Sequence, residues 1–450
     1  CAEMGVGIQM VYRSRPIVKA EAAEALMVRT LGSGANGIGY YMYHGGSTPK
    51  QNNGVGFFSD DGMGMPKISY DYQAPIGEFG LVRDSYQNLR ILHTFLKDFG
   101  SILAPMETVL PEGYEKITPD NRETLRYAAR MKEDAGFIFM TNFQDHDTAR
   151  FDQTDLQLKL KLKKQTLIIP SSKTFTLKKD QSVILPFNLS MEGALLKYST
   201  TQLLAKVEEK NAVHYFFFAP EGLRTEYSFD KSTLSSGKEF YTPKPGLKST
   251  FSITVKNGKT LKITTLTRQQ ALNTTKVNNH ILITEATVLP EKEQCTLLSL
   301  GKTQISYALY TANKGWKEET IEVQPVDVKA DWKKVGTRRM TVKIDQPDVP
   351  QVNDYFLRVN YVADVAMAFI GGYLVLDHYY YGIPWTIGLR RFKNELKNEY
   401  LSFYFRPLRK DAPFIGDLPV EAIPDFSQKD ADCLVRSVDV IPEYKAIVNI

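Results

Sequence analysis

The sequence has few of the residues from which disulfide frameworks and metal centres are built. Its three cysteines, Cys1, Cys295 and Cys433, are odd in number and far apart, so they predict no disulfide framework. The six histidines are scattered, and the sequence has neither a CxxC pair nor a cysteine–histidine cluster. This pattern predicts no metal site, and no cofactor is expected.

Long apolar runs and a strong net charge are also absent. No run of about 18 apolar residues occurs, so no membrane-spanning helix is predicted. The 56 basic and 51 acidic residues give a net charge of +5 without a dominant Lys/Arg block, which argues against a nucleic-acid partner. With 43% hydrophobic and 24% charged residues, the composition is that of an ordinary globular protein, and the length predicts about three domains.

The first hundred residues alternate between strand-like and helix-like segments. Residues 18–31 predict a helix, residues 37–43 a short strand, and a second helix is expected from an N-cap at Asp84 or Ser85 to Gly100. Strands that alternate with helices are typical of a parallel sheet covered on both faces. Two strands cannot make such a sheet, and we therefore expect residues 1–104 to be the last part of a larger α/β unit.

After Pro105 the pattern changes to that of β-structure. Residues 156–162 read Leu-Gln-Leu-Lys-Leu-Lys-Leu, a period of two that places leucines on a core face and lysines in water. Further strand-like runs are residues 166–169, 182–185, 214–219, 250–255, 260–265, 280–284 and 341–344. Their spacing favours β-sandwiches or jelly rolls, and we expect a β-rich domain over residues 105–230, a β-sandwich over 231–330 and a jelly roll over 331–450.

Two segments of the N-terminal part carry side chains suited to chemistry. Glu3 lies near the end of a strand-like start and is followed by glycines, which is the place where α/β barrels hold catalytic groups. The alternative is an ordinary exposed glutamate. In residues 40–46, alternation predicts that Tyr41 and Tyr43 point to one side, where a tyrosine ring and hydroxyl suit a sugar. The alternative is a tyrosine-rich core strand, with His44 in a structural role.

The long loop that follows offers weaker signals. Asp71 and Glu78 could form a carboxylate pair, although turn chemistry and an exposed loop acid explain them more simply. The glycine-rich stretch around Gly54–Gly64 lacks the strand before and the helix after that a phosphate-binding loop requires. No GxSxG, P-loop or HExxH motif is present.

Taken together, three motifs resemble one known family. Tyr-Met-Tyr-His-Gly-Gly at residues 41–46, Ser-Tyr-Asp-Tyr at 69–72 and Ala-Pro-Ile-Gly-Glu at 74–78 look like glycoside hydrolase family 35, the β-galactosidases. Residues 354–366 and 373–385 are similar to the jelly-roll domains of its large bacterial members. The resemblance therefore implies a fold of the α/β plus all-β class, in which the C-terminal end of a (β/α)8 barrel is followed by β-sandwich or jelly-roll domains.

The resemblance also implies an activity and its residues. It implies a retaining exo-β-galactosidase in which Glu3 is the nucleophile and Tyr41 binds the galactose of a β-galactoside glycan, with Tyr43 and Tyr70 as weaker binding candidates. The family's acid/base glutamate belongs to the fourth barrel strand. We therefore expect it in a missing N-terminal portion, and we expect the chain alone to be inactive. The resemblance further suggests a periplasmic or secreted protein.

Alternatives remain open at the level of the sequence. The segment Gly5–Gln9 lacks the tryptophan-rich continuation of the family, and Gln73 replaces an aspartate. A different specificity, such as β-glucosaminidase or β-galactanase, is therefore possible. The β-domains could instead form a carbohydrate-binding module, with Tyr379–Tyr381 and Trp385 as a stacking platform, or they could have a purely structural role.

Overall fold

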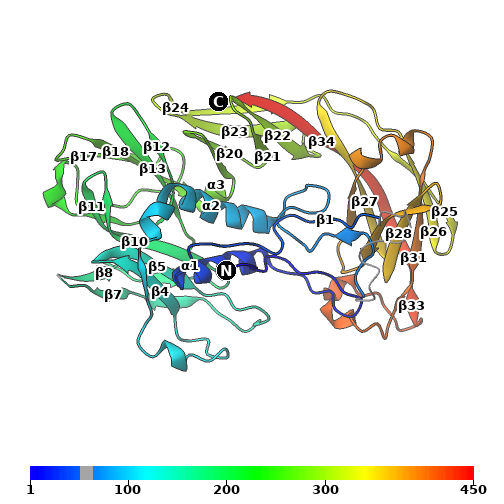
Figure 1. The fold of residues 1–450 in the computed structure, drawn as a ribbon, viewed down its shortest axis with the longest axis horizontal. Coiled ribbons are helices and arrows are strands. Elements are labelled where there is room, and N and C mark those ends of the chain that lie inside the picture. Colours follow the sequence, from blue (N-terminus) through cyan, green and yellow to red (C-terminus); the bar gives the residue numbers. More distant parts are fainter. Residues whose placement is uncertain (51–63, 164) are drawn as a thin grey trace.

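The computed structural model describes residues 1–50, 64–163 and 165–450. Most of the regular secondary structure in these residues is β-sheet, with few helices. In Figure 1, α1 and α2 lie at the centre of the molecule, between β-structure built from residues 107–267 and the β-module of strands β25–β33. The glycine-rich stretch Gly54–Gly64 lies, apart from Gly64, outside the described residues.

Both predicted helices are confirmed. Helix α1 spans Ala20–Gly32 and α2 spans Asp84–Leu103. The apolar stripe of α2 is buried, and Phe95 and Phe99 pack in the same core as Met27 and Val28 of α1. The predicted N-cap is wrong by one residue: Arg83 occupies that position, and Asp84 lies in the first turn, where its charge favours the helix N-terminus.

The predicted parallel strands of the N-terminal part are much shorter than expected. Among the described residues of the segment 1–104, parallel pairing is limited to two isolated bridges, Met4 with Tyr40 and His44 with Ile76. Residues 41–43 form a turn instead of continuing the strand predicted over residues 37–43. The antiparallel pair β1 (Gly46–Ser47) and β2 (Ser69–Tyr70) follows it.

Residues 107–267 fold around two larger sheets. The first has the order β16-β14-β11-β10-β5-β4-β3 and the second the order β12-β13-β18-β17-β15. Strands from both sides of residue 230 belong to each sheet, so the domain boundary predicted there cuts through both. The strands of the first sheet are β3 (Glu107–Val109), β4 (Arg126–Lys132), β5 (Ala135–Thr141), β10 (Ser182–Met191), β11 (Ala194–Ser199), β14 (Tyr227–Phe229) and β16 (Phe240–Tyr241). Those of the second are β12 (Gln202–Glu208), β13 (Ala212–Ala219), β15 (Leu234–Ser236), β17 (Thr250–Val255) and β18 (Thr260–Thr267).

Two short hairpin-like pairs complete this domain. Strands β6 (Gln153–Leu156) and β9 (Phe175–Leu177) form one, and β7 (Leu158–Lys161) and β8 (Thr166–Ile169) form the other. The leucine–lysine alternation is confirmed, because Leu158 is buried while Lys159 and Lys161 are exposed. The other predicted strand runs also lie within observed strands.

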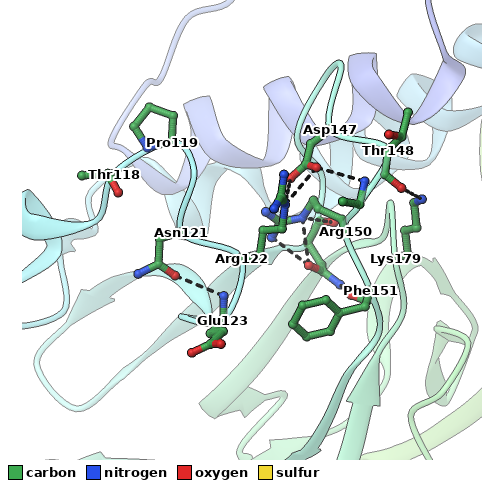
Figure 2. Close-up of polar contacts among 12 residues, drawn as sticks. Thr118, Pro119, Asn121, Arg122, Glu123, Asp147, Thr148, Arg150, Phe151 and Lys179 are labelled. Carbon is green, nitrogen blue, oxygen red and sulfur yellow. Dashed lines mark hydrogen bonds and ion pairs between the residues drawn. The ribbon is translucent and has the colours of Figure 1, made fainter.

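The loops at one edge of this domain are joined by polar contacts (Figure 2). Arg122 donates from Nε to both carboxylate oxygens of Asp147 at 2.8 and 3.0 Å, and Lys179 donates to the carbonyl of Thr148 at 3.1 Å. Arg150 is buried against Asn142. The contact between Arg122 and Asp147 connects residues 118–126 to residues 142–151.

The remainder of the chain forms three further sheets. Their orders are β19-β20-β23-β24, β21-β22-β34-β27-β30 and β25-β26-β31-β28-β29. The strands of the first two are β19 (Thr274–Val277), β20 (His280–Thr284), β21 (Thr287–Pro290), β22 (Gln294–Leu300), β23 (Gln304–Thr311), β24 (Gly315–Glu322), β27 (Val352–Val362), β30 (Trp385–Gly388) and β34 (Leu434–Asn449). Those of the third are β25 (Ala330–Gly336), β26 (Arg339–Ile344), β28 (Val365–Ile370), β29 (Tyr373–Tyr379) and β31 (Leu401–Arg406).

Short elements connect these sheets. They are the pair β32 (Leu408–Arg409) and β33 (Ala431–Asp432), helix α3 (Arg268–Leu272), and 3-10 turns at Tyr114–Lys116, Lys231–Thr233, Arg390–Phe392, Glu395–Lys397, Ile415–Asp417 and Val420–Ala422. Within the part of the chain that the structure describes, no helix combines the length and the apolar character needed to cross a membrane.

The last strand joins two β-modules. One part of β34 pairs with β27 over Leu434–Tyr444, and its end pairs with β22 over Glu443–Asn449. Its buried residues accordingly enter two cores. Val435 and Val438 pack with residues 340–422, whereas Ala446 and Val448 pack with Cys295 and Leu297. The strand therefore ties the module of residues 274–323 to the module of residues 330–450, which is called the C-terminal β-module below.

Candidate functional site

The backbone places Glu3 and Tyr41 on the same face of the N-terminal segment. Met4 donates to the carbonyl of Gly39 at 2.8 Å, and Tyr41 donates to the carbonyl of Met4 at 3.1 Å. Met4 and Tyr40 are thus paired and turn toward the hydrophobic core. The side chains on either side of them, Glu3 and Tyr41, point the other way, and both are exposed.

Tyr41 belongs to a cluster of three tyrosines, Tyr41, Tyr70 and Tyr72. The hydroxyls of Tyr41 and Tyr70 are 2.5 Å apart, and the Tyr72 hydroxyl donates to that of Tyr70 at 3.4 Å. The rings of Tyr41 and Tyr72 meet edge to face at 5.3 Å. The hydrogen bond to Tyr70 raises the pKa of Tyr41, and the nearby Glu3 carboxylate acts in the same direction. We name these residues the tyrosine cluster.

Sequence reasoning missed Tyr72. The signal that could have found it is the alternation within Ser-Tyr-Asp-Tyr, which places Tyr70 and Tyr72 on one side. The backbone is not a regular strand there, because both Tyr72 and Gln73 adopt a positive φ. The approach of the Glu3 segment to this cluster requires glycine at residue 7, because a Cβ there would lie 2.2 Å from the carbonyl oxygen of Tyr72.

The structure separates Tyr43 from Tyr41, so the alternation predicted for this segment is wrong. The turn at residues 41–43 brings Tyr43 to the helix side, where its ring lies 5.4 Å from that of Tyr40 and 5.7 Å from that of His93. Burial raises the pKa of Tyr43 to about 12. Tyr43 is therefore a packing residue between the N-terminal segment and α2.

Asp71 organises the loop behind the tyrosine cluster. Its carboxylate pairs with Arg83 at 2.5 Å and accepts from the backbone amides of Gln73 at 3.2 Å and Glu78 at 2.7 Å. Gly45 permits this packing, because a Cβ there would lie 2.7 Å from the carbonyl oxygen of Asp71. The turn chemistry predicted for Asp71 is confirmed. Gly45 is needed because the backbone of Asp71 lies against it.

Glu78 is buried, contrary to the prediction of an exposed loop acid. Its side chain is 4% exposed and lies 3.5 Å from Arg391 of the C-terminal β-module. Ser47 donates a hydrogen bond to it. Burial raises the pKa of Glu78 to about 7, against the opposing effects of Ser47, Ser69 and Arg391. The loop is thus held between two parts of the chain.

A second contact ties the N-terminal segment to the C-terminal β-module. Arg15 is fully buried and pairs with Asp364 at 2.6 Å. It also donates to the carbonyls of Asp364 at 2.8 Å and Tyr380 at 3.0 Å, and its guanidinium lies 3.4 Å from the centre of the Phe414 ring. Gln73, which departs from the family pattern, holds the adjoining backbone by donating to the carbonyl of Pro16 at 2.9 Å.

A cavity of about 270 Å³ lies where these parts meet. Its walls include Asp71, Tyr72, Glu78 and Arg83 from the N-terminal part, and Tyr381 and Trp385 from the C-terminal β-module. It adjoins the tyrosine cluster through Tyr72. The arrangement offers carboxylate, guanidinium and aromatic groups to a polar ligand.

The aromatic residues of the C-terminal β-module are mostly core residues. Trp385 is 4% and Tyr380 is 2% exposed, and His378 stacks on Trp385 at 5.2 Å. An exposed stacking platform at Tyr379–Tyr381 and Trp385 is therefore not what the structure shows. Metal-ligand geometry is likewise not found, since no group of three or more His, Cys, Asp or Glu side chains suited to a metal occurs among the described residues.

Comparison with known proteins shows which family the chain resembles. Residues 1–96 match the sequence model of Glycosyl hydrolases family 35, and residues 112–287 match that of Beta-galactosidase, domain 2. By these matches the chain is related to glycosyl hydrolase family 35. The first match contains Glu3 and the tyrosine cluster. The second spans residue 230, in agreement with the sheets that cross that position.

Individual proteins are similar to parts of the chain. Beta-galactosidase 6 of Oryza sativa subsp. japonica is 27% identical over 144 residues, which are 32% of this chain and 15% of the rice protein. The chain thus spans a small part of that relative's length. The crystal structure of a GH31 alpha-xylosidase from Xanthomonas citri aligns over 76% of this chain and 37% of its own, at 10% identity and a TM-score of 0.12.

Proposed function

We propose that this chain carries the nucleophile and part of the sugar-binding site of a retaining exo-β-galactosidase. The observation that carries the proposal is the common face of Glu3 and Tyr41, set by the hydrogen bonds of Met4 to Gly39 and Tyr41. It places a carboxylate beside exposed tyrosine hydroxyls within the segment that matches family 35. As part of this proposal, residues 1–104 contribute the last two βα units of a (β/α)8 barrel.

The proposed reaction follows the two-step scheme of retaining glycosidases. The Glu3 carboxylate attacks the anomeric carbon, the glycosidic bond breaks, and a galactosyl ester of Glu3 forms while a second carboxylic acid protonates the leaving oxygen. That second group then deprotonates a water molecule, which hydrolyses the ester. Such groups stand about 5–5.5 Å apart. The family resemblance puts the acid/base on the fourth barrel strand, and we therefore expect the 450-residue chain by itself to show no turnover.

The tyrosine cluster has the chemistry to bind the terminal galactose. Tyr41 is 40% exposed, so its hydroxyl is accessible beside Glu3, and its hydrogen bond to Tyr70 fixes its direction. Hydroxyl groups on rigid aromatic rings combine hydrogen bonding with apolar contact to the sugar ring. Tyr43 contributes packing behind the site.

Turnover of p-nitrophenyl β-D-galactopyranoside by the gene product that carries this chain tests the proposal. We expect Glu3→Ala to lose almost all turnover, and added azide to restore part of it by entering the space of the missing carboxylate. Attack from that face gives the α-galactosyl azide. The matched control is Glu21→Gln, at an exposed position of α1, which should retain wild-type turnover. A wild-type protein without turnover, or a Glu3→Ala variant with normal turnover, would contradict the proposal.

A further inference from the structure

We infer that Asp377, on strand β29 of the C-terminal β-module, is a positioning residue for the tyrosine cluster. The inference rests on the proposed function and deepens it. In this inference, the Asp377 carboxylate sets the positions of the tyrosine hydroxyls that face the sugar. In the sequence, Asp377 lies 308 residues after the Ser69 that it binds and 307 residues after Tyr70.

The Asp377 carboxylate holds three successive backbone amides. It accepts from Lys67 at 2.5 Å, from Ile68 at 3.1 Å and from Ser69 at 2.8 Å. Asp377 is 4% exposed, so these bonds form away from water. Hydrogen bonds to an ionised acceptor are stronger than those between neutral groups, and three on one carboxylate define both the position and the direction of the segment.

The same strand provides a second anchor for this segment. Tyr379 donates its hydroxyl to the carbonyl of Met65 at 3.1 Å. Residues 377 and 379 share a face of β29 because side chains alternate along a strand. Leu376 and His378 occupy the other face, where Leu376 is buried in the core and His378 stacks on Trp385. One face of β29 thus packs its own module, and the other holds residues 65–69.

The anchored amides lead directly into the tyrosine cluster. Ser69 and Tyr70 form β2, which pairs with β1 by only two residues. So short a pairing does not fix a strand by itself. Alternation turns the side chain of Ser69 inward, where it is buried and hydrogen bonds to Glu78, and turns Tyr70 outward to the hydroxyl of Tyr41. The position of Tyr70 therefore depends on the bond between Asp377 and Ser69.

This dependence matters because sugar binding requires accurate placement. Misplacement of a binding group by about 1 Å can reduce catalytic efficiency by about a hundredfold. A shift of β2 of that size would break the hydrogen bond between Tyr70 and Tyr41 and change the direction of the Tyr41 hydroxyl. The C-terminal β-module would in this way determine substrate affinity without contacting the substrate.

The test compares Asp377→Asn, Tyr70→Phe and the double variant in the gene product that carries this chain, with p-nitrophenyl β-D-galactopyranoside as the substrate. Asparagine has the same shape as aspartate, but an NH₂ group replaces one of the two oxygens that accept hydrogen bonds from the backbone amides. That NH₂ group cannot accept a hydrogen bond. We expect KM to rise about tenfold in each single variant, with a smaller change in kcat, and the double variant to be no worse than Tyr70→Phe. The matched control is Glu443→Gln. Glu443 is a buried carboxylate of the same module, but it binds Asn353 and not the segment before Tyr70, so we expect this variant to keep a KM within about twofold of wild type.

The outcomes separate the inference from the proposed function. Absence of turnover in the wild-type protein would overturn the proposed function and this inference with it. Normal wild-type turnover with an unchanged KM in Asp377→Asn, or strictly additive effects in the double variant, would overturn the inference alone. If Asp377→Asn does not fold, Tyr379→Phe removes the second anchor more gently. It should raise KM about twofold to fivefold, and an unchanged KM would overturn the inference.

Discussion

Arg15 and Asp364 lie 349 residues apart in the sequence and form a fully buried ion pair, with 2.6 Å between Nη2 and Oδ1. The pair is enclosed by Tyr12, Tyr379 and Phe414, whose ring centres lie 5.6, 4.7 and 3.4 Å from the guanidinium carbon. It joins the segment before α1 to the C-terminal β-module. Removal of one partner leaves the other charge buried without compensation.

Substitution of this pair should destabilise the chain strongly. We expect Asp364→Ala to lower the free energy of unfolding by about 3–5 kcal/mol, because it leaves the Arg15 charge buried. The measurement is chemical unfolding followed by tryptophan fluorescence. As a control, Lys302→Ala breaks an ion pair whose side chains are 69% and 71% exposed, and should change stability by less than about 1 kcal/mol. Equal effects of the two variants would contradict the importance of burial.

The burial of Glu78 should make stability depend on pH. Its pKa is raised from 4.5 to about 7 in the folded chain. Between these values the folded state retains a proton that the unfolded state has lost, so the free energy of unfolding falls as pH rises from 4.5 to 7 and levels off above 7. Glu78→Gln is neutral at every pH. Relative to wild type, it should therefore be more stable at pH 8 than at pH 4 by on the order of 3 kcal/mol.

Unfolding curves of both proteins across this pH range provide the measurement. The difference between wild type and Glu78→Gln isolates this carboxyl group from the other titrating residues. Ser47, Ser69, Arg391 and Asp71 are the polar and charged groups that act on it. A difference in stability that does not vary with pH would show that Glu78 is ionised or solvated in the folded chain.

Tyr41 and Tyr43 should respond differently to removal of the hydroxyl. We expect Tyr41→Phe to lower kcat/KM for p-nitrophenyl β-D-galactopyranoside by about 10- to 100-fold, as the loss of a hydrogen bond to a bound sugar would do. Tyr43→Phe should leave kcat/KM within about twofold, because its ring packs against Tyr40 and His93. The reverse order of effects would place the substrate on the helix side of the segment.

Trp385 should behave as a core residue. At 4% exposure, its replacement by alanine removes a large buried side chain, and we expect a loss of about 3–5 kcal/mol in stability. Tyr373→Ala, at a position that is 69% exposed, should cost less than about 0.5 kcal/mol. If Trp385→Ala instead abolished binding on a glycan array while stability stayed normal, the rival interpretation of a carbohydrate-binding platform would be favoured.

Local patterns in the sequence predicted the local structure well. The apolar spacing of residues 89–99 predicted α2, and the alternation of residues 156–162 predicted that leucines face the core and lysines face water, because both patterns depend only on neighbours in the chain. The tyrosine pair Tyr41 and Tyr70 was also singled out from sequence. Tyr43 was grouped with Tyr41 because a regular period of two was assumed across a segment that turns.

The contacts between distant segments could not be predicted in the same way. Arg15 and Asp377 look like ordinary surface residues in sequence, since their partners lie more than 300 residues away. The boundary near residue 230 failed for the same reason. Strands on either side of it are shared between two sheets by long-range pairing, which leaves no local signal.

The pairing of β34 has a consequence for the order of events during protein synthesis. Strand β22 reaches its partner in β34 only when residues 443–449 leave the ribosome, about 140 residues after β22, or roughly 7–30 s at typical rates of elongation. Until then one edge of β22 and part of the core around Cys295 and Leu297 are unpaired. A nascent chain held in this interval presents an open β-edge to its neighbours, so the speed of translation through the C-terminal module governs how long the chain is prone to aggregate.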